Sequence, residues 1–320
     1  MACGEFDLIE RFFKKRQNQR SDVIVPIGDD CAVLAPIADQ LLAVSTDTLV
    51  SGVHFYPDMP PHALGYKSLA VNLSDLAAMG ATPRWVSLAI TLPNVDENWL
   101  EPFSAGFFEA AEYYDIQLIG GDVTKGPLSI TLTVQGQIPR NQQITRSGAN
   151  VGDWICVTGQ LGDSALGLQN LAGKISLLEG DKARVIKKHY YPVPRLLAGQ
   201  ALRGVATAAI DLSDGLASDV GHIAKASGCK AVIDVDSLPL SDALLANTSV
   251  EQAVALALAG GEDYELCFTV APSALSALET LLAHTGASFT CIGQMHAGEG
   301  VEFARDNKQI NLELEGFVHF

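Results

Sequence analysis

Short apolar segments typical of β-strands alternate with helical segments along most of this chain. Strands are expected at Leu41–Thr46, which is apolar and ends at a polar cluster, and at Trp85–Leu92 and Leu128–Ile138. Helices are expected between them, at Gly65–Met79 and Trp99–Tyr114. Because interleaved strands and helices pack as layers around a common core, the pattern predicts an α/β or α+β fold.

The expected helix over Gly65–Met79 has the clearest periodicity. Leu69, Leu73 and Leu76 recur at i, i+4 and i+7, which places them on one helical face. Gly80 follows, and glycine is the residue that most often ends a helix. The helix is therefore expected to bury one face and to stop at Gly80.

The length of 320 residues favours two domains. Residues 139–152 are polar, contain Pro and Gly and lack periodicity, so they are the expected junction between an N-terminal domain, 1–138, and a C-terminal domain, 153–320. The second domain again mixes strands such as WICVTG with helices. Within it, TAAIDLSDGLASDVGHIAKASG is expected to form a strand, a turn and a helix that closes at Gly228.

The charge balance excludes some classes of function. Hydrophobic residues make up 48% of the chain and charged residues 18%, as in a well-packed globular protein, and the formal net charge is −16. The densest basic run, Arg11 to Arg20, is one short amphipathic segment that is interpreted as a solvated helix face, so no nucleic-acid binding is expected. An acidic protein that handles phosphates repels its ligand unless divalent cations invert the local charge.

The cysteines and the N-terminus bear on the compartment. The six cysteines are scattered and none forms a C-x-x-C pair, which argues against a zinc site or a disulfide framework and fits a reducing compartment. The N-terminal MACGEFDLIERFFKKR has charges where a signal peptide would have its apolar core, and no apolar run reaches the ~18 residues that span a bilayer. A soluble, cytoplasmic protein without membrane association is expected.

A series of aspartates at the ends of predicted strands is expected to carry the chemistry. They are Asp29 and Asp30 in IGDDCAVL, Asp47 in AVSTDTLVSGVHF, Asp75 in NLSDLAAMG, Asp122 in IGGDVTKG, and Asp211 and Asp214 in IDLSDGL. Carboxylates are costly to cluster unless cations neutralise them. Oxygen ligands without Cys or His at metal spacing favour Mg²⁺ or Mn²⁺ over zinc, and Ser45 and Thr46 add oxygens beside Asp47. The pattern predicts a multi-magnesium site.

Each of these residues also has a structural explanation. Asp after Gly forms turns and Asp before a helix is an N-cap, so Asp214 could cap a helix that begins at Gly215. Asp75, one turn after Asn72, could be a helix-surface aspartate. The doublets Gly120-Gly121 and Gly260-Gly261 allow close backbone approach to a ligand, or form β-turns. No Walker A sequence, kinase glycine-rich loop or G-x-G-x-x-G occurs, so these common cradles do not hold ATP here.

As a set, the motifs resemble those of thiamine-monophosphate kinases, which belong to the aminoimidazole ribonucleotide synthetase superfamily. GDDCAVL, STDTLVSGVHF, GYKSLAVNLSDLAAMGATPRW, GGDVTKG, RSGANVGDWICVTG, DLSDGLASD and GGEDYEL occur in the order seen in that family. The resemblance runs from about residue 5 to the C-terminal GFVHF. GDD and DLSDGL indicate only the superfamily, whereas STDTLVSGVHF, GGEDYEL and the aromatic tail are more specific to the thiamine-monophosphate branch.

The resemblance implies a fold and an activity. The fold is a two-domain α/β structure in which the N-terminal mixed sheet with its helices pairs with that of a second subunit into a barrel-like sheet. The resemblance further implies a homodimer that binds ATP in a cleft between the domains, beside several Mg²⁺ ions. The reaction that it implies is phosphorylation of thiamine monophosphate to thiamine diphosphate.

The resemblance also assigns site residues, carried over motif by motif. The implied metal ligands are Asp30, Ser45, Thr46, Asp47, Asp75, Asp122, Asp211 and Asp214; the implied ATP contacts are Gly121, Asp122, Arg146 and Ser213; the implied substrate contacts are His54, Glu262 and Phe317. The structural alternatives are a linker arginine for Arg146, a satisfied histidine beside Phe55 and Tyr56 for His54, and a core anchor for Phe317.

The acceptor determines which catalytic groups are needed. A phosphate monoester has a second pKa near ~6, so its oxygens are already ionised at neutral pH and no general base or covalent nucleophile is assigned. The aspartates are expected to hold Mg²⁺ for direct in-line transfer. An aspartyl-phosphate intermediate is the alternative, but nothing in the sequence selects one aspartate for it.

Two other function classes stay open from the sequence. One is another ATP-dependent enzyme of the superfamily, such as a ligase that closes an imidazole ring, or a selenide-activating enzyme, for which Cys3 lies near the N-terminus but without a glycine-rich loop. The other is an acidic divalent-cation-binding protein, which contiguous D-x-D-x-D-G loops would favour.

Overall fold

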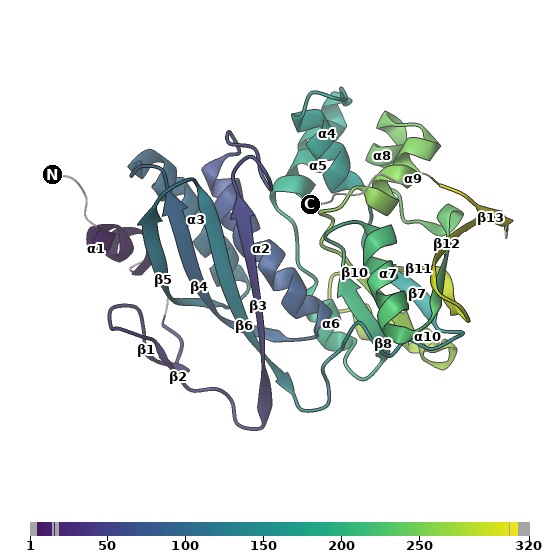
Figure 1. Cartoon of the computed structure of the whole chain (residues 1–320), viewed down its shortest axis with the longest axis horizontal. Coiled ribbons are helices and arrows are strands. Elements are labelled where there is room, and N and C mark those ends of the chain that lie inside the picture. Colours follow the sequence, from purple (N-terminus) through teal and green to yellow (C-terminus); the bar gives the residue numbers. More distant parts are fainter. Residues whose placement is uncertain (1–4, 15, 17–18, 307, 313–320) are drawn as a thin grey trace. The chain divides into compact units, whose positions relative to one another are not determined.

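The computed structural model describes residues 5–14, 16, 19–306 and 308–312. The chain divides into two compact units (Figure 1). Unit 1 comprises Met1–Leu76 and Ala81–Asn141, and unit 2 comprises Ala77–Gly80 and Gln142–Phe320. Each unit has its own sheet and helices, which confirms the predicted mixed α/β fold with two domains.

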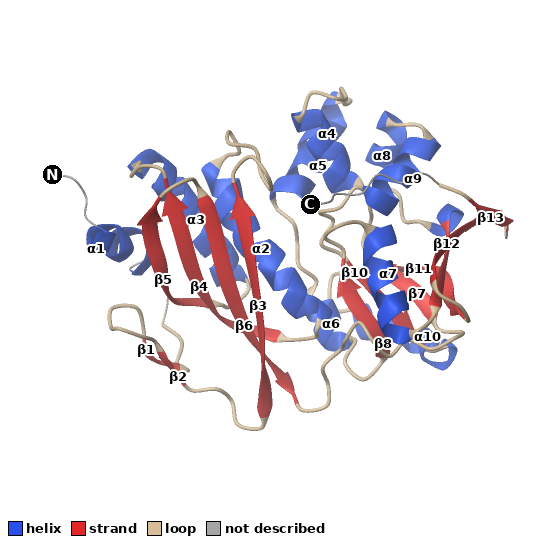
Figure 2. Cartoon of the chain, viewed as in Figure 1, coloured by secondary structure: helices blue, strands red, loops and turns tan. Residues whose placement is uncertain are grey.

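Within the described part of unit 1, four strands form a mixed sheet in the order β3–β6–β4–β5. Strands β4 and β5 are parallel, and the other neighbouring pairs are antiparallel. Helices α2 and α3 lie on one face of this sheet (Figure 2). The bounds are α1 Glu5–Leu8, a π-helical turn Ile9–Lys14, β1 Val23–Val25, β2 Val33–Leu34, β3 Gln40–Val50, α2 Pro61–Ala78, β4 Thr82–Leu92, α3 Glu97–Tyr113, β5 Gln117–Lys125 and β6 Ser129–Pro139.

Helix α2 is buried on all sides from Ala63 to Ser74, so the prediction of a single buried face is wrong. A second helix packs against it very closely. A Cβ atom at Gly65 would lie 2.0 Å from the carbonyl oxygen of Phe103 on α3, and only glycine permits this approach. A helix enclosed by a sheet and another helix must be apolar around most of its circumference.

The predicted end of α2 at Gly80 is confirmed. Gly80 has a φ of 68°, and its N–H bonds to the carbonyl of Ala77 at 2.9 Å. The N–H of Ala81 reaches back to the carbonyl of Leu76 at 2.7 Å. Together these bonds form a Schellman motif, in which a glycine in the left-handed region satisfies the last carbonyls of the helix.

The placement of two aspartates at strand ends is wrong. Asp47 lies inside β3, and Asp122 lies inside β5, a strand that the sequence does not predict. Both are edge strands of the sheet, and edge positions tolerate polar and charged side chains that a central strand would exclude. Asp211, in contrast, is the last residue of its strand, as predicted.

In the described part of unit 2, seven strands form a sheet in the order β13–β12–β9–β11–β7–β10–β8. All neighbouring pairs are antiparallel except β9 and β12. The bounds are β7 Trp154–Thr158, α4 Asp163–Leu171, α5 Glu179–Tyr190, α6 Leu196–Ala201, β8 Ala206–Asp211, α7 Leu216–Ser227, β9 Lys230–Asp234, a 3₁₀ turn Val235–Ser237, α8 Asp242–Asn247, α9 Val250–Ala259, β10 Leu266–Val270, a 3₁₀ turn Pro272–Ala274, α10 Leu275–Leu282, β11 Phe289–His296, β12 Gly300–Arg305 and β13 Lys308–Ile310.

The core of unit 2 lies between this sheet and helices α7 and α9. It contains Ile155, Val157, Ile210, Val220, Ile223, Ile233 and Leu258, all of them buried. Helix α7 begins after a tight loop that follows β8 and ends at Gly228, whose φ is 63°, so the predicted strand, turn and helix are confirmed. This arrangement places the loop between β8 and α7 at the end of a strand next to β10.

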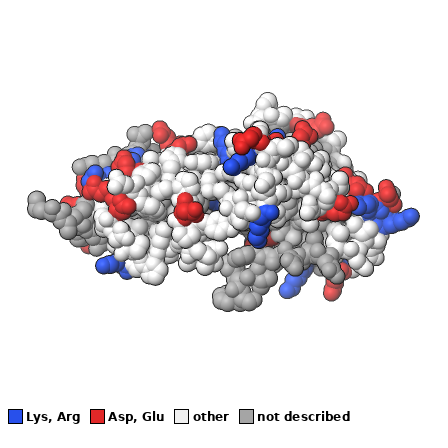
Figure 3. All heavy atoms as spheres, turned by 90° about the horizontal axis from the view of Figure 1, so that it is seen from above, with Lys and Arg blue, Asp and Glu red and all other residues white. Residues whose placement is uncertain are grey.

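Acidic and basic side chains are interspersed on the face of the molecule shown in Figure 3. In the part of the chain that the structure describes, no helix is both long enough and apolar enough to cross a bilayer.

Candidate active site

Two predicted metal ligands on β3 lie beside helix α2. The hydroxyl of Ser45 donates a hydrogen bond to Oδ2 of Asp75 at 2.5 Å, and the N–H of Asp47 donates one to Oδ1 of Asn72 at 3.2 Å. The amide of Asn72 in turn donates to the carbonyl of Ser68, one helical turn earlier, at 2.8 Å. The fold thus brings Ser45 and Asp47 on β3 next to Asp75 on α2, a helix whose position is fixed by its burial.

Thr46 points to the opposite face of the sheet, because neighbouring side chains of a strand alternate. Its hydroxyl pairs with that of Thr133 on β6 at 2.9 Å. Only the main chain of Thr46 therefore lies beside Ser45 and Asp47. Desolvation raises the pKa of Asp47, although the residue as a whole stays exposed on this edge strand.

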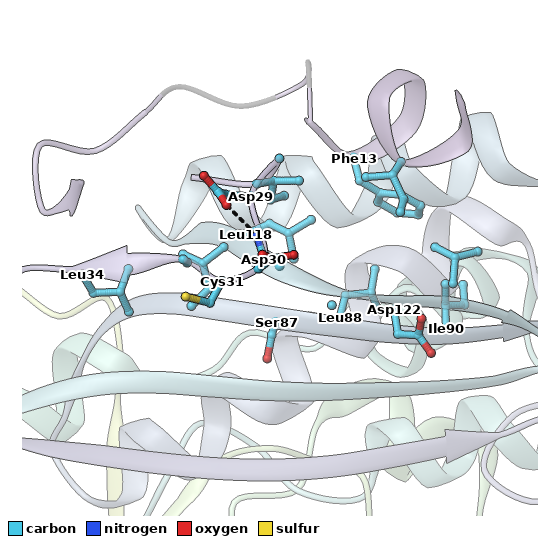
Figure 4. A pocket seen from close by; sticks show the side chains of 18 of the residues that line it. Phe13, Asp29, Asp30, Cys31, Leu34, Ser87, Leu88, Ile90, Leu118 and Asp122 are labelled. Atoms are coloured by element: carbon cyan, nitrogen blue, oxygen red, sulfur yellow. Dashed lines mark hydrogen bonds between the residues drawn. The ribbon is translucent and has the colours of Figure 1, made fainter. Parts of the chain in front are cut away.

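Asp30, Gly121 and Asp122 line a cavity of about 740 Å³ at the β5 edge of the same sheet. Asp29, Asp30 and Cys31, in the loop between β1 and β2, lie over the strands that carry Leu88, Ile90 and Asp122 (Figure 4). Oδ1 of Asp29 accepts the N–H of Asp30 at 2.9 Å and so shapes this loop. Cavities of this size are typical of small-molecule sites.

The glycine doublet in β5 is neither a turn nor a loop. Gly120 and Gly121 follow a bulge at Ile119, where two residues of β5 lie opposite one step of β4. Gly121 has a φ of 150°, and a Cβ atom there would lie 1.7 Å from the carbonyl oxygen of Leu88. Close approach to the neighbouring strand, rather than to a ligand, therefore requires glycine at this position.

The two groups of acidic residues in unit 1 lie on opposite edges of the sheet. Asp47 shares a register row with Leu132, Leu88 and Gly121, one residue before Asp122. Three interstrand spacings separate β3 from β5, about 14 Å. Among the residues described, no three His, Cys, Asp or Glu side chains gather closely enough to hold a metal ion.

His54 lies in the turn that follows β3. Its Nδ1 accepts the N–H of Val50 at 3.0 Å, and the residue is half-buried beside the buried Phe55. One ring nitrogen therefore has a structural role, which is the alternative that the sequence left open.

A third acidic group, in unit 2, lies in the loop between β8 and α7. Asp211 is buried, Ser213 is half-buried and Asp214 is exposed. Asp214 does not cap α7, because the helix begins after Gly215 and the loop is bound by another residue. Oδ2 of Asp219 accepts the N–H groups of Ser213, Asp214 and Gly215 at 3.0, 3.2 and 3.1 Å.

Asp219 is buried at the first turn of α7, and its hydrogen bonds fix the main chain of the loop that precedes this helix. Desolvation and the nearby charge of Asp214 raise the pKa of Asp219 to about 7, against the opposing effect of its three backbone hydrogen bonds. One carboxylate oxygen that accepts three main-chain donors fixes the conformation of a loop far more tightly than a single N-cap bond does.

The loop after β8 is joined directly to the segment that precedes β10. The N–H of Glu262 donates to the carbonyl of Ser213 and the N–H of Tyr264 donates to the carbonyl of Leu212, both at 2.8 Å. Glu262 and Tyr264 have positive φ values of 58° and 50°. Non-glycine residues in this region cost energy and concentrate at functional sites.

The three carboxylates of the GGEDYEL motif have different environments. Oε2 of Glu262 lies 3.3 Å from Nδ1 of His189, which is buried and also lies 3.1 Å from Oγ of Ser164. Both carboxylate oxygens of Asp263 accept the N–H of Gly162 at 3.0 Å. Glu265 is buried and accepts two hydrogen bonds from Arg195 at 2.5 Å.

Two of these carboxylates therefore support the fold. Thr158 on β7 adds a third hydrogen bond to Glu265, at 2.6 Å, so the buried charge is fully paired. Desolvation by burial raises the pKa of Asp263 well above its ordinary value, because the N–H of Gly162 only partly offsets it. The side chain of Glu262 is half-buried, with 26% of its surface exposed, which leaves it as the member of the motif able to meet a ligand.

Arg146 is exposed, in a segment that runs beside β8 and α7. Its carbonyl accepts the hydroxyl of Ser227 at 3.4 Å, and the carbonyl of Thr145 accepts the N–H of Ala209 at 3.0 Å. The structure thus attaches this segment to unit 2 and leaves the guanidinium at the surface. Phe317 lies outside the residues that the structure describes.

Sequence reasoning does not identify Asp219, His189 or Ser164. For Asp219 a signal exists, since the last Asp of DLSDGLASD lies one turn into the expected helix, where a carboxylate meets free N–H groups. For His189 and Ser164 none exists, because their contacts with each other and with Glu262 join three distant segments.

The side chains of the candidate metal ligands in each unit offer only oxygen atoms, as carboxylates and hydroxyls. Such a set fits Mg²⁺ or Mn²⁺ and does not fit zinc.

Two family models match most of the chain. Residues 28–138 match the N-terminal domain of the AIR synthase related proteins, and residues 150–306 match their C-terminal domain. The chain is 56% identical to a thiamine-monophosphate kinase of Escherichia coli K12, over 100% of this chain and 99% of that protein. It is 49% identical to a thiamine-monophosphate kinase of Haemophilus influenzae, with the same coverage.

The fold is also similar to solved structures of thiamine-monophosphate kinases. A crystal structure of thiamine-monophosphate kinase from Stenotrophomonas maltophilia K279a matches with a TM-score of 0.88 and 45% identity, covering 97% of this chain and 99% of that one. A structure described as AaThiL complexed with AMPPCP and TMP matches with a TM-score of 0.78 and 33% identity, covering 99% and 97%. With matching domain models over most of its length and these full-length relatives, this chain belongs to the thiamine-monophosphate kinase family of the AIR synthase related proteins.

Proposed function

We propose that this protein transfers the γ-phosphate of ATP to thiamine monophosphate and so forms thiamine diphosphate and ADP. The observation that carries the proposal is the 56% identity, over the whole chain, to a thiamine-monophosphate kinase. The 2.8 Å hydrogen bond from the N–H of Glu262 to the carbonyl of Ser213 is consistent with it. It joins the loop expected to contact ATP to the residue expected to contact the substrate. The relatives named above are thiamine-monophosphate kinases, which favours this reaction over the ring-closing ligase, the selenide-activating enzyme and the cation-binding protein.

The transfer is a direct displacement. An ionised oxygen of the acceptor phosphate forms a bond to the γ-phosphorus of ATP, the bond from that phosphorus to the β–γ bridging oxygen breaks, and ADP leaves. No residue has to remove a proton, because the acceptor is largely ionised near pH 7. The residues of this chain bind and align the two phosphates.

We propose that the metal ligands are those expected from the sequence, with Thr46 acting through its main chain. Asp30, Ser45, Thr46, Asp47, Asp75 and Asp122 in unit 1 and Asp211 and Asp214 in unit 2 make up this set. Mg²⁺, when bound, supplies the positive charge that lets two polyanions approach. The hydroxyl of Ser45 orients the carboxylate of Asp75, and Asn72 fixes the main chain at Asp47.

The same proposal assigns Gly121, Asp122, Arg146 and Ser213 to ATP, and His54, Glu262 and Phe317 to the thiamine phosphate. The carboxylate of Glu262 is suited to accept a hydrogen bond from the amino group of the pyrimidine. His189 and Ser164 position that carboxylate from behind.

We further propose a homodimer, formed through the face of the unit 1 sheet opposite to α2 and α3, and a cytoplasmic location. Leu42 and Val44 project from that face of β3 with 54% and 57% of their surface exposed. Apolar side chains on an uncovered sheet are the surface that a second copy would bury. The location is supported by the scattered cysteines.

The test is turnover by the purified protein with ATP, thiamine monophosphate and excess Mg²⁺, scored as ADP and thiamine diphosphate. Asp47→Asn and Asp122→Asn should each lower the rate at least 100-fold, while the thermal unfolding temperature stays within a few degrees of the parent protein. Asp58→Asn, at an exposed aspartate outside the proposed site, is the control and should keep the parent rate. Near-parent rates in Asp47→Asn and Asp122→Asn would remove the metal assignment, and absence of turnover in the parent protein would remove the function.

A further inference from the structure

Two cysteines that lie far apart in the sequence meet on the sheet of unit 2. Cys156 on β7 and Cys291 on β11 are directly opposite each other in the antiparallel register. Their sulfur atoms are 2.7 Å apart, across a separation of 135 residues. The spacing of the cysteines in the sequence argues against a disulfide framework, but spacing cannot reveal a pair that the fold assembles.

The pair is isolated from the third cysteine of the sheet. Phe268, not Cys267, lies opposite Cys156 on the other neighbouring strand, β10. Side chains of adjacent residues on a strand point to opposite faces, so Cys267 belongs to the other face. It packs there in the buried core with Val157 and Ile210.

The two thiols differ in access and acidity. Cys156 is buried, whereas Cys291 is half-buried and is followed by a bulge at Ile292 that interrupts the pairing of β11 with β7. The hydrogen bond from Cys156 lowers the pKa of Cys291, although desolvation opposes it. Cys291 is thus the accessible nucleophile, and Cys156 is the thiol placed to resolve an adduct on it.

The backbone geometry suits a covalent link. Residues directly opposite in antiparallel strands have Cα atoms about 4.5 or 5.5 Å apart, and disulfides join Cα atoms about 4.4–6.8 Å apart. We propose that Cys156 and Cys291 form an oxidation site that accepts a low-molecular-weight disulfide and closes reversibly to a cross-strand disulfide. In reducing compartments such bonds are transient and redox-sensing rather than structural.

The reaction balances without any further reactant. The thiolate of Cys291 attacks one sulfur of the small disulfide, which forms a mixed disulfide and releases one small thiol. Cys156 then loses its proton and attacks the sulfur of Cys291, which releases the second small thiol. Two protein thiols are oxidised by two electrons, and one small disulfide is reduced to two thiols.

The experiment uses the folded, full-length protein in glutathione buffers of graded ratio of reduced to oxidised form. After alkylation of remaining thiols and digestion without reductant, mass spectrometry should find a peptide that links Cys156 to Cys291, in an amount that rises with the oxidised fraction and disappears with dithiothreitol. Cys291→Ser and Cys156→Ser should abolish this linked peptide. Cys267→Ser and Cys31→Ser are matched controls and should retain it.

Three results would overturn the proposal. The first is absence of the linked peptide in the most oxidising buffer. The second is glutathione that remains on Cys291 without transfer to Cys156, which would show that the pair cannot resolve. The third is linkage that forms only when urea unfolds the protein, since the site must be the folded sheet. None of these results bears on the proposed kinase activity, which is measured separately.

Discussion

At the scale of single residues, two adjacent glycines of this protein differ in whether a larger side chain would fit in their place. Gly120 and Gly121 are neighbours on β5 and both line the cavity with Asp30 and Asp122. A Cβ atom at Gly121 would overlap the carbonyl of Leu88, whereas no atom lies within 4 Å of a Cβ atom at Gly120. The cavity wall therefore has no room for a side chain at Gly121 but has room for one at Gly120.

Gly121→Ala should destabilise the protein by about 1–3 kcal/mol, because β5 must move away from β4 to admit the methyl group. The same movement displaces Asp122, so the KM for ATP should rise as well. Urea unfolding and initial rates measure the two effects. Gly120→Ala is the matched control, and equal losses in the two variants would show that strand contact is not the cause.

The raised pKa of Asp263 predicts that the stability of the protein depends on pH. Burial raises the pKa of Asp263 well above its ordinary value of 3.8. Between those two values the unfolded chain has released a proton that the folded protein still holds, so stability falls as the pH rises through this range. Each unit by which the pKa is raised costs about 1.4 kcal/mol at high pH.

Asp263→Asn should remove this dependence. The neutral amide keeps an acceptor for the N–H of Gly162, so the variant should match the parent protein near pH 4 and exceed it in free energy of unfolding above pH 7. Urea unfolding at a series of pH values measures the difference. Asp242→Asn, at an exposed aspartate, should show no such divergence, and parallel pH profiles for Asp263→Asn and the parent protein would contradict the assignment.

At the scale of elements, the loop between β8 and α7 acts as one unit with the helix that follows. The carboxylate of Asp219 holds three consecutive N–H groups of this loop. Since the loop carries Ser213 and Asp214, the orientation of both depends on a residue that touches no ligand. Asp219 is therefore a positioning residue in the proposed site.

Asp219→Ala should lower kcat/KM for ATP by roughly 10–100-fold, because three main-chain donors lose their acceptor and the loop relaxes. Asp219→Asn retains a carbonyl oxygen in the same place and should recover much of the loss. Steady-state kinetics with varied ATP measure both variants. Ser218→Ala, at the exposed neighbour, is the control. Equal rates in Asp219→Ala and the parent protein would show that the loop holds its shape without this carboxylate.

The elements that the sequence predicts well are those with strong periodicity or distinct ends. Helix α3 is expected at Trp99–Tyr114 and observed at Glu97–Tyr113, and α7 ends at Gly228 as expected. Strand β5 is not predicted, because a glycine pair in its middle has the composition of a turn. Helix α5, Glu179–Tyr190, is not predicted because few of its residues are buried, and so it has little apolar periodicity.

The candidate site is predictable only in part, for a related reason. The aspartates stand out in the sequence because each lies in a short motif with glycine or a hydroxyl residue. Which aspartates lie near one another cannot be predicted from the sequence, because it depends on strand order. Asp47 and Asp122, for example, occupy opposite edges of one sheet. The position of Asn72 one turn before Asp75 follows from helix spacing. The contacts of Asn72 with Asp47 and of His189 with Glu262 follow from long-range packing alone.

At the scale of the whole molecule, the edge-to-edge separation of Asp47 and Asp122 bears on how many chains make one site. Three interstrand spacings, about 14 Å, are too wide for both carboxylates to bind one ion. In the proposed dimer, the β3 edge of one copy and the β5 edge of the other would supply the two residues. A site shared in this way can be detected by complementation, because two inactive variants can together form an active dimer.

Mixed dimers of Asp47→Asn and Asp122→Asn chains should regain activity, although each variant alone is inactive. Random exchange makes half of the dimers mixed, and each mixed dimer holds one intact site of two, so about a quarter of the parent activity should return. Steady-state rates before and after subunit exchange measure the recovery. Mixing Asp47→Asn with Asp47→Ala chains is the control, and absence of recovery in exchanged dimers would place each site within one chain.

Helix α2 supplies Asn72 and the half-buried Asp75 from a helix that is buried from Ala63 to Ser74 and whose last turn is closed by Gly80. A metal-binding residue at a frayed helix end can lose its metal while the rest of a protein stays folded. Asp75 lies within a packed helix, so it cannot move away unless the helix itself unfolds. Heating should then not yield a compact species that has merely lost its affinity for divalent ions. Loss of activity and unfolding of helix α2 should therefore occur at the same temperature. The thermal stability of the enzyme is then set by its fold and not by its active site.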